Sequence, residues 1–252
     1  SIPVSILITC IVSVILTIKV YTKSPIIDKS LETDKKFSFH FFTASMMGGL
    51  SYVMFLSFDI ILAKHYLSPE GAGIYSMLSL VGKMIYFFGT LLNTFVITLV
   101  SRAEGQGKNP KKEFLKLFAG TAFLSIGAGL GIATLGWFLV PLLLGSKAMA
   151  VVSYLPMYAL AITLFNLSTT IVVYELARKN YFFPMISAVM SLGMLVAIYL
   201  EHSSVHEFVE AITKTNILYF GVVLFSYFFY DQFVFVYRNV KDILIVFKKL
   251  PA

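Results

Sequence analysis

The chain has 252 residues, of which 58% are hydrophobic and 13% are charged, and its mean hydropathy is +0.84. A soluble domain is about a quarter charged, and its helices keep a polar face that most of the apolar segments here lack. The composition therefore argues against a soluble domain. Cys10 is the single cysteine, which excludes an intramolecular disulfide and a cysteine cluster for a metal ion.

Apolar runs recur along the chain at the length that a membrane span requires, about 20 residues. They predict an all-α fold, a polytopic transmembrane helical bundle with seven spans at 3–21, 39–63, 72–100, 114–136, 150–176, 181–200 and 208–230. The first span begins almost at Ser1, without the basic start or the cleavage motif of a signal peptide. We therefore expect the chain to be a fragment of a longer protein.

Basic residues gather in alternate connections between these spans. The first, third and fifth connections and the tail hold most of them: Lys23, Lys29, Lys35, Lys36, Arg102, Lys108, Lys111, Lys112, Lys116, Arg178, Lys179, Arg238, Lys241, Lys248 and Lys249. The positive-inside rule puts these connections in the cytoplasm, which predicts Ser1 outside and Ala252 inside. The net charge of +7 then predicts contact with anionic membrane lipids and no binding of nucleic acid.

Polar residues form a stripe along the third span. They are three, four or seven residues apart and therefore share one helix face: Ser76, Ser79, Lys83, Thr90, Thr94 and Thr98. The stripe predicts the lining of a polar cavity. The alternative is that the hydroxyls bond to their own helix backbone while the Lys83 side chain extends towards the membrane surface.

Asp59 is a second charge within an apolar segment, towards the outer end of the second span. Lys83 lies at a comparable depth in the next span, so an Asp59–Lys83 charge pair is plausible, and it has either a structural role or a role in transport. Asn166, in the fifth span, is interpreted as a hydrogen-bond partner between helices, with a place in the cavity as the alternative. After Asp231 the tail is predicted either as an interfacial helix or as an extension of the seventh helix.

Catalytic patterns are missing from the sequence. It contains no glycine-rich phosphate loop, no Ser–His–Asp spacing and no metal-ligand cluster. His202 and His206 are four residues apart but lie in a loop without a neighbouring cysteine. We expect no enzymatic activity, no cofactor and no metal site.

One stretch resembles a known family. DIILAKHYLSPEGAGIYSMLSLVGK, from Asp59 to Lys83, resembles the first outer hairpin in the C-terminal half of polysaccharide-export flippases. These are lipid-linked oligosaccharide flippases of the O-antigen-flippase type, within the multidrug/oligosaccharidyl-lipid/polysaccharide exporter superfamily. VPLLLGSKAMAVVSYLPMYALA and YELARKN are similar to later segments of that family, and the basic connection after the third span also matches.

The resemblance implies a division of the chain and a missing partner. The family has two lobes of six helices, so residues 1–21 would be the last helix of a missing N-terminal lobe and 22–38 a cytoplasmic linker. Residues 39–230 would form the C-terminal lobe, and 231–252 a basic cytoplasmic or interfacial tail. The implied location is a bacterial or archaeal plasma membrane.

The implied function is export of a lipid-linked oligosaccharide or polysaccharide precursor by alternating access. The missing lobe and membrane lipids are expected partners, and polysaccharide polymerase or glycosyltransferases are further ones. Lys83 is expected to contact the pyrophosphate head group, Thr90, Asn93 and Thr94 the sugar, and Asp59 to couple transport to an ion. A multidrug or cation exporter of the same superfamily and a scaffold subunit without transport are the alternatives.

Overall fold

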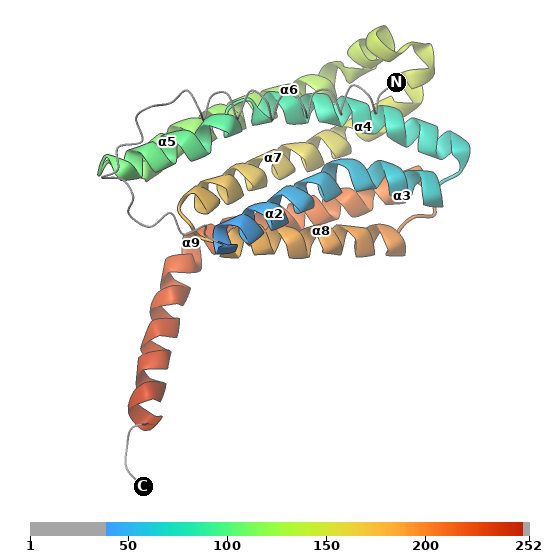
Figure 1. The fold of residues 1–252 in the computed structure, drawn as a ribbon. Coiled ribbons are helices and arrows are strands. Elements are labelled where there is room, and N and C mark those ends of the chain that lie inside the picture. The colour runs from blue at the N-terminus through green and yellow to red at the C-terminus, as the bar shows by residue number, and fades with distance from the viewer. Residues whose placement is uncertain (1–38, 249–252) are drawn as a thin grey trace, which may run out of the picture. The chain divides into compact units, whose positions relative to one another are not determined.

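The computed structural model describes residues 39–248, and every regular element within them is a helix (Figure 1). Six helical segments of this part are long and apolar enough to cross a membrane: Phe39–Tyr66, Pro69–Gly105, Pro110–Leu144, Ala148–Ala177, Phe182–Leu200 and Val205–Tyr230. The predicted all-α, polytopic transmembrane bundle is thereby confirmed. The predicted span 3–21 and the linker 22–38 lie outside the described residues.

The first described span is a helix with an irregular middle. It consists of α2 (Phe39–Val53), the π-helical turn η2 (Met54–Phe58) and α3 (Asp59–Tyr66). Ser68 then caps the next helix, because its Oγ accepts a hydrogen bond from the Gly71 N–H at 3.1 Å. This cap marks the connection between the two spans.

The second described span is divided, although the sequence predicts one uninterrupted helix over 72–100. α4 (Pro69–Thr90) and α5 (Asn93–Gly105) are separated at residues 91–92. The Thr90 hydroxyl lies 3.1 Å from the Tyr86 carbonyl and 3.2 Å from the Phe87 carbonyl. A threonine that bonds to the preceding turn distorts a helix, which accounts for a break at this place.

Of the remaining spans, the first and the last are longer than predicted, while the other two agree with the prediction within a few residues. They are α6 (Pro110–Leu144), α7 (Leu155–Ala177), which follows the 3-10 helix η3 (Ser146–Tyr154), and α8 (Phe182–Leu200). α9 (Val205–Lys248) continues well beyond Tyr230. This agrees with the interpretation of the tail as an extension of the seventh helix.

α7 is the central helix of the bundle. It packs against α4, α5, α6, α8 and α9, while α2 packs against α8. Figure 1 shows α7 between a layer that contains α4, α5 and α6 and a layer that contains α2, α8 and α9. Most side chains of α7 are buried, including the polar ones of Asn166 and Thr170. Large apolar side chains such as Phe123 and Trp137 of α6 are exposed instead, as expected of helices that face lipid.

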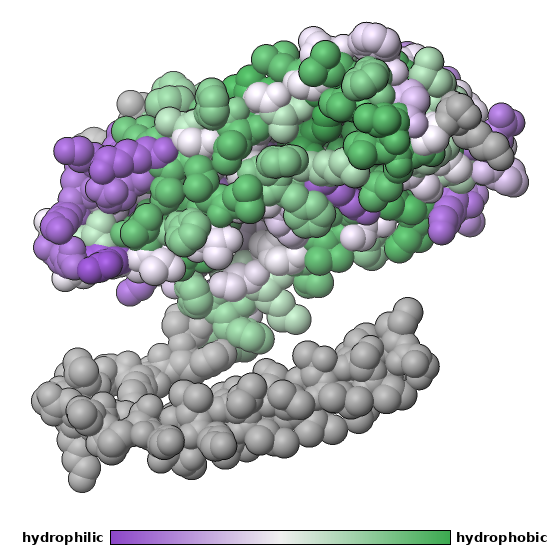
Figure 2. All heavy atoms as spheres, turned by 90° about the horizontal axis from the view of Figure 1, so that it is seen from above, coloured by the Kyte–Doolittle hydropathy of each residue, from purple (hydrophilic) through white to green (hydrophobic). Residues whose placement is uncertain are grey.

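The two ends of the bundle differ in charge. The α5–α6 and α7–α8 connections lie at one end, here called the basic end, with Arg102, Lys108, Lys111, Lys112, Lys116, Arg178 and Lys179. Figure 2 shows hydrophilic residues gathered at this end and hydrophobic ones along the side of the bundle. The α3–α4 and α8–α9 connections lie at the opposite end.

Candidate functional site

A cavity of about 430 Å³ lies between α2, η2, the end of α4, α5, α7, α8 and α9. Its lining contains hydroxyl and amide groups, from Ser45, Ser51, Tyr52, Thr90, Asn93, Thr94, Thr169, Ser187 and Tyr219. Among the described residues, none that lines it is charged. In each span the lining residues lie near the middle or between the middle and the basic end. The cavity therefore occupies the half of the bundle nearer the basic end.

Asn93 stands in the cavity wall with one end of its amide unpaired. The Thr170 hydroxyl lies 2.8 Å from Asn93 Oδ1 and 2.8 Å from the Asn166 carbonyl. Asn93 is only 9% exposed, and its Nδ2 has no hydrogen-bond partner among the described residues. An unpaired buried amide group is costly. Because Asn93 lines the cavity while its Nδ2 is itself buried, a ligand would pair with this amide after a small rotation of the side chain.

Aromatic rings form another part of the cavity wall. Phe55 stacks on Tyr219 with 5.2 Å between ring centroids, and lies 4.9 Å from Phe165. Tyr52 lies 6.0 Å from Phe165. The Tyr219 hydroxyl is 2.7 Å from Ser187 Oγ. The wall therefore combines flat apolar faces with hydroxyl groups at their edges, which is typical of small-molecule sites.

Asp59 is the centre of a second polar cluster, which lies nearer the opposite end. It is only 2% exposed. Its Oδ2 accepts hydrogen bonds from Tyr75 Oη at 2.7 Å, Ser79 Oγ at 3.2 Å and Tyr158 Oη at 3.3 Å, and its Oδ1 accepts one from the Ile60 N–H at 2.8 Å. These four donors satisfy the carboxylate without a cation.

Lys83 therefore has a different position from the one predicted. It is partly exposed, and the ion pairs of the described residues do not include an Asp59–Lys83 contact. The hydroxyls of Tyr75, Ser79 and Tyr158 occupy the carboxylate instead. Lys83 does not line the cavity either, whereas Thr90, Asn93 and Thr94 line it together.

The polar stripe that the sequence predicts along one helix face, from Ser76 to Thr98, is divided between different partners. Ser76 bonds to its own helix, with its Oγ 2.7 Å from the Ala72 carbonyl, Ser79 bonds to Asp59, and Thr90 and Thr94 line the cavity. Thr98 is not part of its lining. The break after Thr90 and the alternative partners explain why one sequence stripe serves two separate places.

A comparison with protein families identifies the chain more closely. The profile of a family described as "Polysaccharide biosynthesis protein" matches residues 1–153. The chain belongs to this family. No curated protein and no solved structure matches the chain.

The family match contains every residue that the sequence singles out for a site. It includes Asp59, Lys83, Thr90, Asn93 and Thr94, while α7, α8 and α9, which complete the cavity, follow the matched residues. Sequence reasoning missed five lining residues that these elements, α2 and η2 contribute: Tyr52, Phe55, Phe165, Ser187 and Tyr219. The available signal was the small-residue run TASMMGGLS of α2, where Gly48 and Gly49 line the cavity.

Asn166 connects helices, as predicted. It is fully buried, and its Nδ2 lies 3.4 Å from the carbonyls of Ile85 and Tyr86 on α4. Gly89 makes this approach possible, because a Cβ there would collide with the Asn166 amide and with Ser125 Oγ. Asn166 thus stabilises the α4–α7 contact next to the cavity without lining it.

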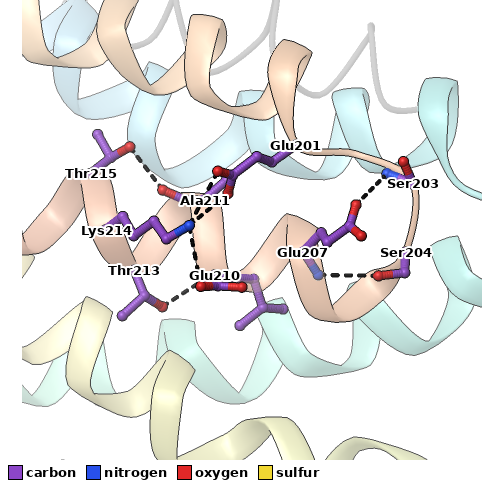
Figure 3. A network of polar contacts seen from close by, with 10 residues as sticks. Glu201, Ser203, Ser204, Glu207, Glu210, Ala211, Thr213, Lys214 and Thr215 are labelled. Atoms are coloured by element: carbon purple, nitrogen blue, oxygen red, sulfur yellow. Dashed lines mark hydrogen bonds and ion pairs between the residues drawn. The ribbon is translucent and has the colours of Figure 1, made fainter.

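The opposite end carries a surface network that joins α8 to α9 (Figure 3). Lys214 lies 3.1 Å from Glu201 and 3.2 Å from Glu210. Glu207 accepts a hydrogen bond from the Ser203 N–H at 3.1 Å, and its own N–H donates to Ser204 Oγ at 3.2 Å. This reciprocal cap fixes the start of α9, so the network is structural.

Among the described residues no group of His, Cys, Asp and Glu has the arrangement of a metal site.

Proposed function

We propose that the chain is the C-terminal lobe of a flippase that moves a lipid-linked oligosaccharide or polysaccharide precursor from the inner to the outer leaflet. One observation carries the proposal: a membrane bundle of a polysaccharide biosynthesis family has a cavity with hydroxyl, amide and aromatic walls in the half nearer its basic end. Sugars have hydroxyl groups on apolar rings, and the lining of this cavity is complementary to both.

The placement of charge supports the proposed direction of transport. The positive-inside rule assigns the basic end, and with it Ala252, to the cytoplasm. The cavity then lies towards the cytoplasmic side, where a carrier must collect its substrate from the inner leaflet. The proposed membrane is a bacterial or archaeal plasma membrane.

The proposal divides the chain as its resemblance to export flippases implies. Residues 1–21 are the last helix of the other lobe, 22–38 the linker, 39–230 this lobe and 231–252 its tail. Transport then proceeds by rocking of one lobe against the other around the site. Polysaccharide polymerase or glycosyltransferases are the proposed partners that receive or supply the saccharide.

Three groups have proposed roles. Thr90, Asn93 and Thr94 bond to sugar hydroxyls from the cavity wall. Lys83, one turn beyond Ser79 and two turns before Thr90 on α4, provides positive charge for the pyrophosphate. Asp59 couples transport to a proton or cation gradient, since intramembrane carboxylates are costly and commonly serve such steps.

The decisive experiment is a transport measurement. The protein encoded by the complete reading frame is reconstituted into liposomes, and translocation of a lipid-pyrophosphate-linked saccharide is measured beside efflux of ethidium. We expect saccharide translocation, its loss in Lys83→Ala and partial retention in Lys83→Arg, which keeps the charge. Unchanged translocation in Lys83→Ala would disprove the head-group role.

The same measurement decides between the proposal and its rivals. Efflux of ethidium alone would establish a multidrug or cation exporter, although the described cavity lining has no acidic residue to favour a cation. Absence of both activities, with loss of polymer export when the gene is deleted, would establish a scaffold subunit.

A further inference from the structure

We infer that the cavity takes an uncharged sugar residue, that Asn93 determines this specificity, and that acidic sugars and the pyrophosphate stay outside the cavity. The inference rests on the proposed function and names the part of the substrate that this site holds. Three features of the described residues support it: the absence of charge from the wall, the unpaired amide of Asn93, and the aromatic rings.

The first feature is the uncharged wall. A carboxylate or phosphate in the membrane interior needs a counter-charge or a full set of donors. The described lining provides hydroxyls, amides and rings but no cation. Lys83 does not compensate for this, because it is outside the lining. Unlike the hydroxyls around Asp59, several hydroxyls of this wall already donate to carbonyls of the protein: Ser51 to Met47, Thr90 to Tyr86 and Thr169 to Phe165. An acidic sugar in the cavity would therefore lack a full set of donors.

The second feature is the amide of Asn93 at the break between α4 and α5. The single proton of the Thr170 hydroxyl can be donated either to the Asn93 amide oxygen or to the Asn166 carbonyl. In the first case Asn93 Nδ2 is left unpaired; in the second the amide can turn, donate to Thr170, and leave its oxygen unpaired. A sugar hydroxyl donates and accepts, so it fits both arrangements, whereas phosphate and carboxylate oxygens only accept.

The third feature is the set of aromatic rings in the same cavity wall. Phe55, Phe165 and Tyr219 contact one another within the wall, and Tyr52 adds a ring with a hydroxyl. Flat apolar faces match the C–H face of a pyranose ring, while Ser187 and the tyrosine hydroxyls reach its edge. Packing of this kind favours an uncharged ring over a hydrated ion.

The test uses a cysteine in the cavity and does not depend on transport. In the complete protein with Cys10 and any further native cysteine replaced by serine, Gly49→Cys places a thiol in the lining, where a Cβ meets nothing within 4 Å. Gly127→Cys on α6 is the matched control, since its Cβ also has open space. The alkylation rate by a neutral maleimide is measured in nanodiscs with an alkyl glucoside, an alkyl glucuronide or the alkyl alcohol of equal chain length.

We expect the glucoside to slow alkylation at position 49 by about tenfold and the other two probes by less than about twofold, since a site built for hydroxyls rejects ligands that leave its polar groups unpaired. The rate at position 127 should not change. Equal protection by the glucuronide, or equal protection by the alcohol, would overturn the inference, as would no protection by any probe. Saccharide translocation with equal protection would refute the inference alone and leave the proposed function intact.

The role of Asn93 has its own variants. Asn93→Leu should raise the glucoside concentration for half-protection about tenfold, the effect of about one lost hydrogen bond, while Thr134→Val on the exposed face of α6 leaves it unchanged. If Asn93→Leu does not fold, Asn93→Ala takes its place. An unchanged concentration in a folded Asn93 variant would remove Asn93 from the site.

Discussion

The two halves of the bundle use the same helices in opposite ways. One half of the bundle lies away from the basic end. There, Asp59 is surrounded by the span of α2 and α3, by α4 and by α7, and its carboxylate has four donors. In the half near the basic end, the same spans with α5 enclose a cavity and leave an amide group of Asn93 unpaired. The carboxylate of Asp59 is thus satisfied within the protein, whereas the amide of Asn93, in the wall of the cavity, is not.

The largest expected effect on the free energy of unfolding comes from removing the Asp59 carboxylate. Asp59→Leu leaves the hydroxyls of Tyr75, Ser79 and Tyr158 without their acceptor, and each unpaired buried group costs about 1–3 kcal/mol. We expect the free energy of unfolding in mixed micelles to fall by at least about 3 kcal/mol. Asp59→Asn, which keeps one acceptor oxygen, should lose clearly less. Equal losses in the two variants would contradict the role of the hydroxyl contacts.

The next effect tests the close packing between the halves. Gly89→Ala forces the Asn166 amide and Ser125 away from α4, and overpacking of this kind costs about 1–3 kcal/mol. Gly127→Ala is the matched control, because its Cβ meets nothing within 4 Å. Thermal unfolding of the two variants in detergent gives the comparison, and an equally stable Gly89→Ala protein would show that the helices are less tightly packed than described.

A smaller effect is expected from the cavity wall. Tyr219→Phe removes the 2.7 Å contact with Ser187, and one such hydrogen bond contributes about 1 kcal/mol. Ser187 keeps a second partner, the Phe183 carbonyl at 3.3 Å, so the loss should not exceed this. Denaturant unfolding of Tyr219→Phe beside Tyr199→Phe, whose ring is exposed, measures it. A loss as large as that of Asp59→Leu would mean that the wall is structural.

The smallest effect on stability is expected at Asn93. One end of its amide is unpaired, and Thr170 retains the Asn166 carbonyl, so Asn93→Leu should change the free energy of unfolding by less than about 1 kcal/mol. The comparison is sharpest if the same variant loses glucoside protection. A strongly destabilised Asn93→Leu protein would speak for a structural amide.

Much of this architecture is visible in the sequence, because it depends on local patterns. Apolar length predicts the spans. Glu210 and Lys214 are four residues apart, one helical turn, and their ion pair at 3.2 Å is of the kind that this spacing favours. The common cavity position of Thr90, Asn93 and Thr94 also follows from spacing along one segment. Their contact with sugar stays a prediction.

The rest depends on contacts between distant segments. Tyr158 is 99 residues from Asp59, and no pattern along the chain indicates that its hydroxyl replaces Lys83 at the carboxylate. The apolar spans predict how deep Asp59 and Lys83 lie in the membrane. They do not predict the direction in which each side chain points around its helix axis. The rings of Phe55 and Tyr219 meet only because η2 and α9 border the same cavity.

The π-helical turn at Met54–Phe58 has a consequence for the gene. A π-helical turn holds one residue more than an α-helical turn, and one residue is about 100° of rotation in an α-helix. Loss of one codon within 54–58 is therefore expected to restore a regular helix while Tyr52 and Asp59 keep their directions. The same loss in the middle of α7 would rotate Tyr158 by about 100° relative to Thr170. The contact of Tyr158 with Asp59 and the contact of Thr170 with Asn93 could then no longer form together.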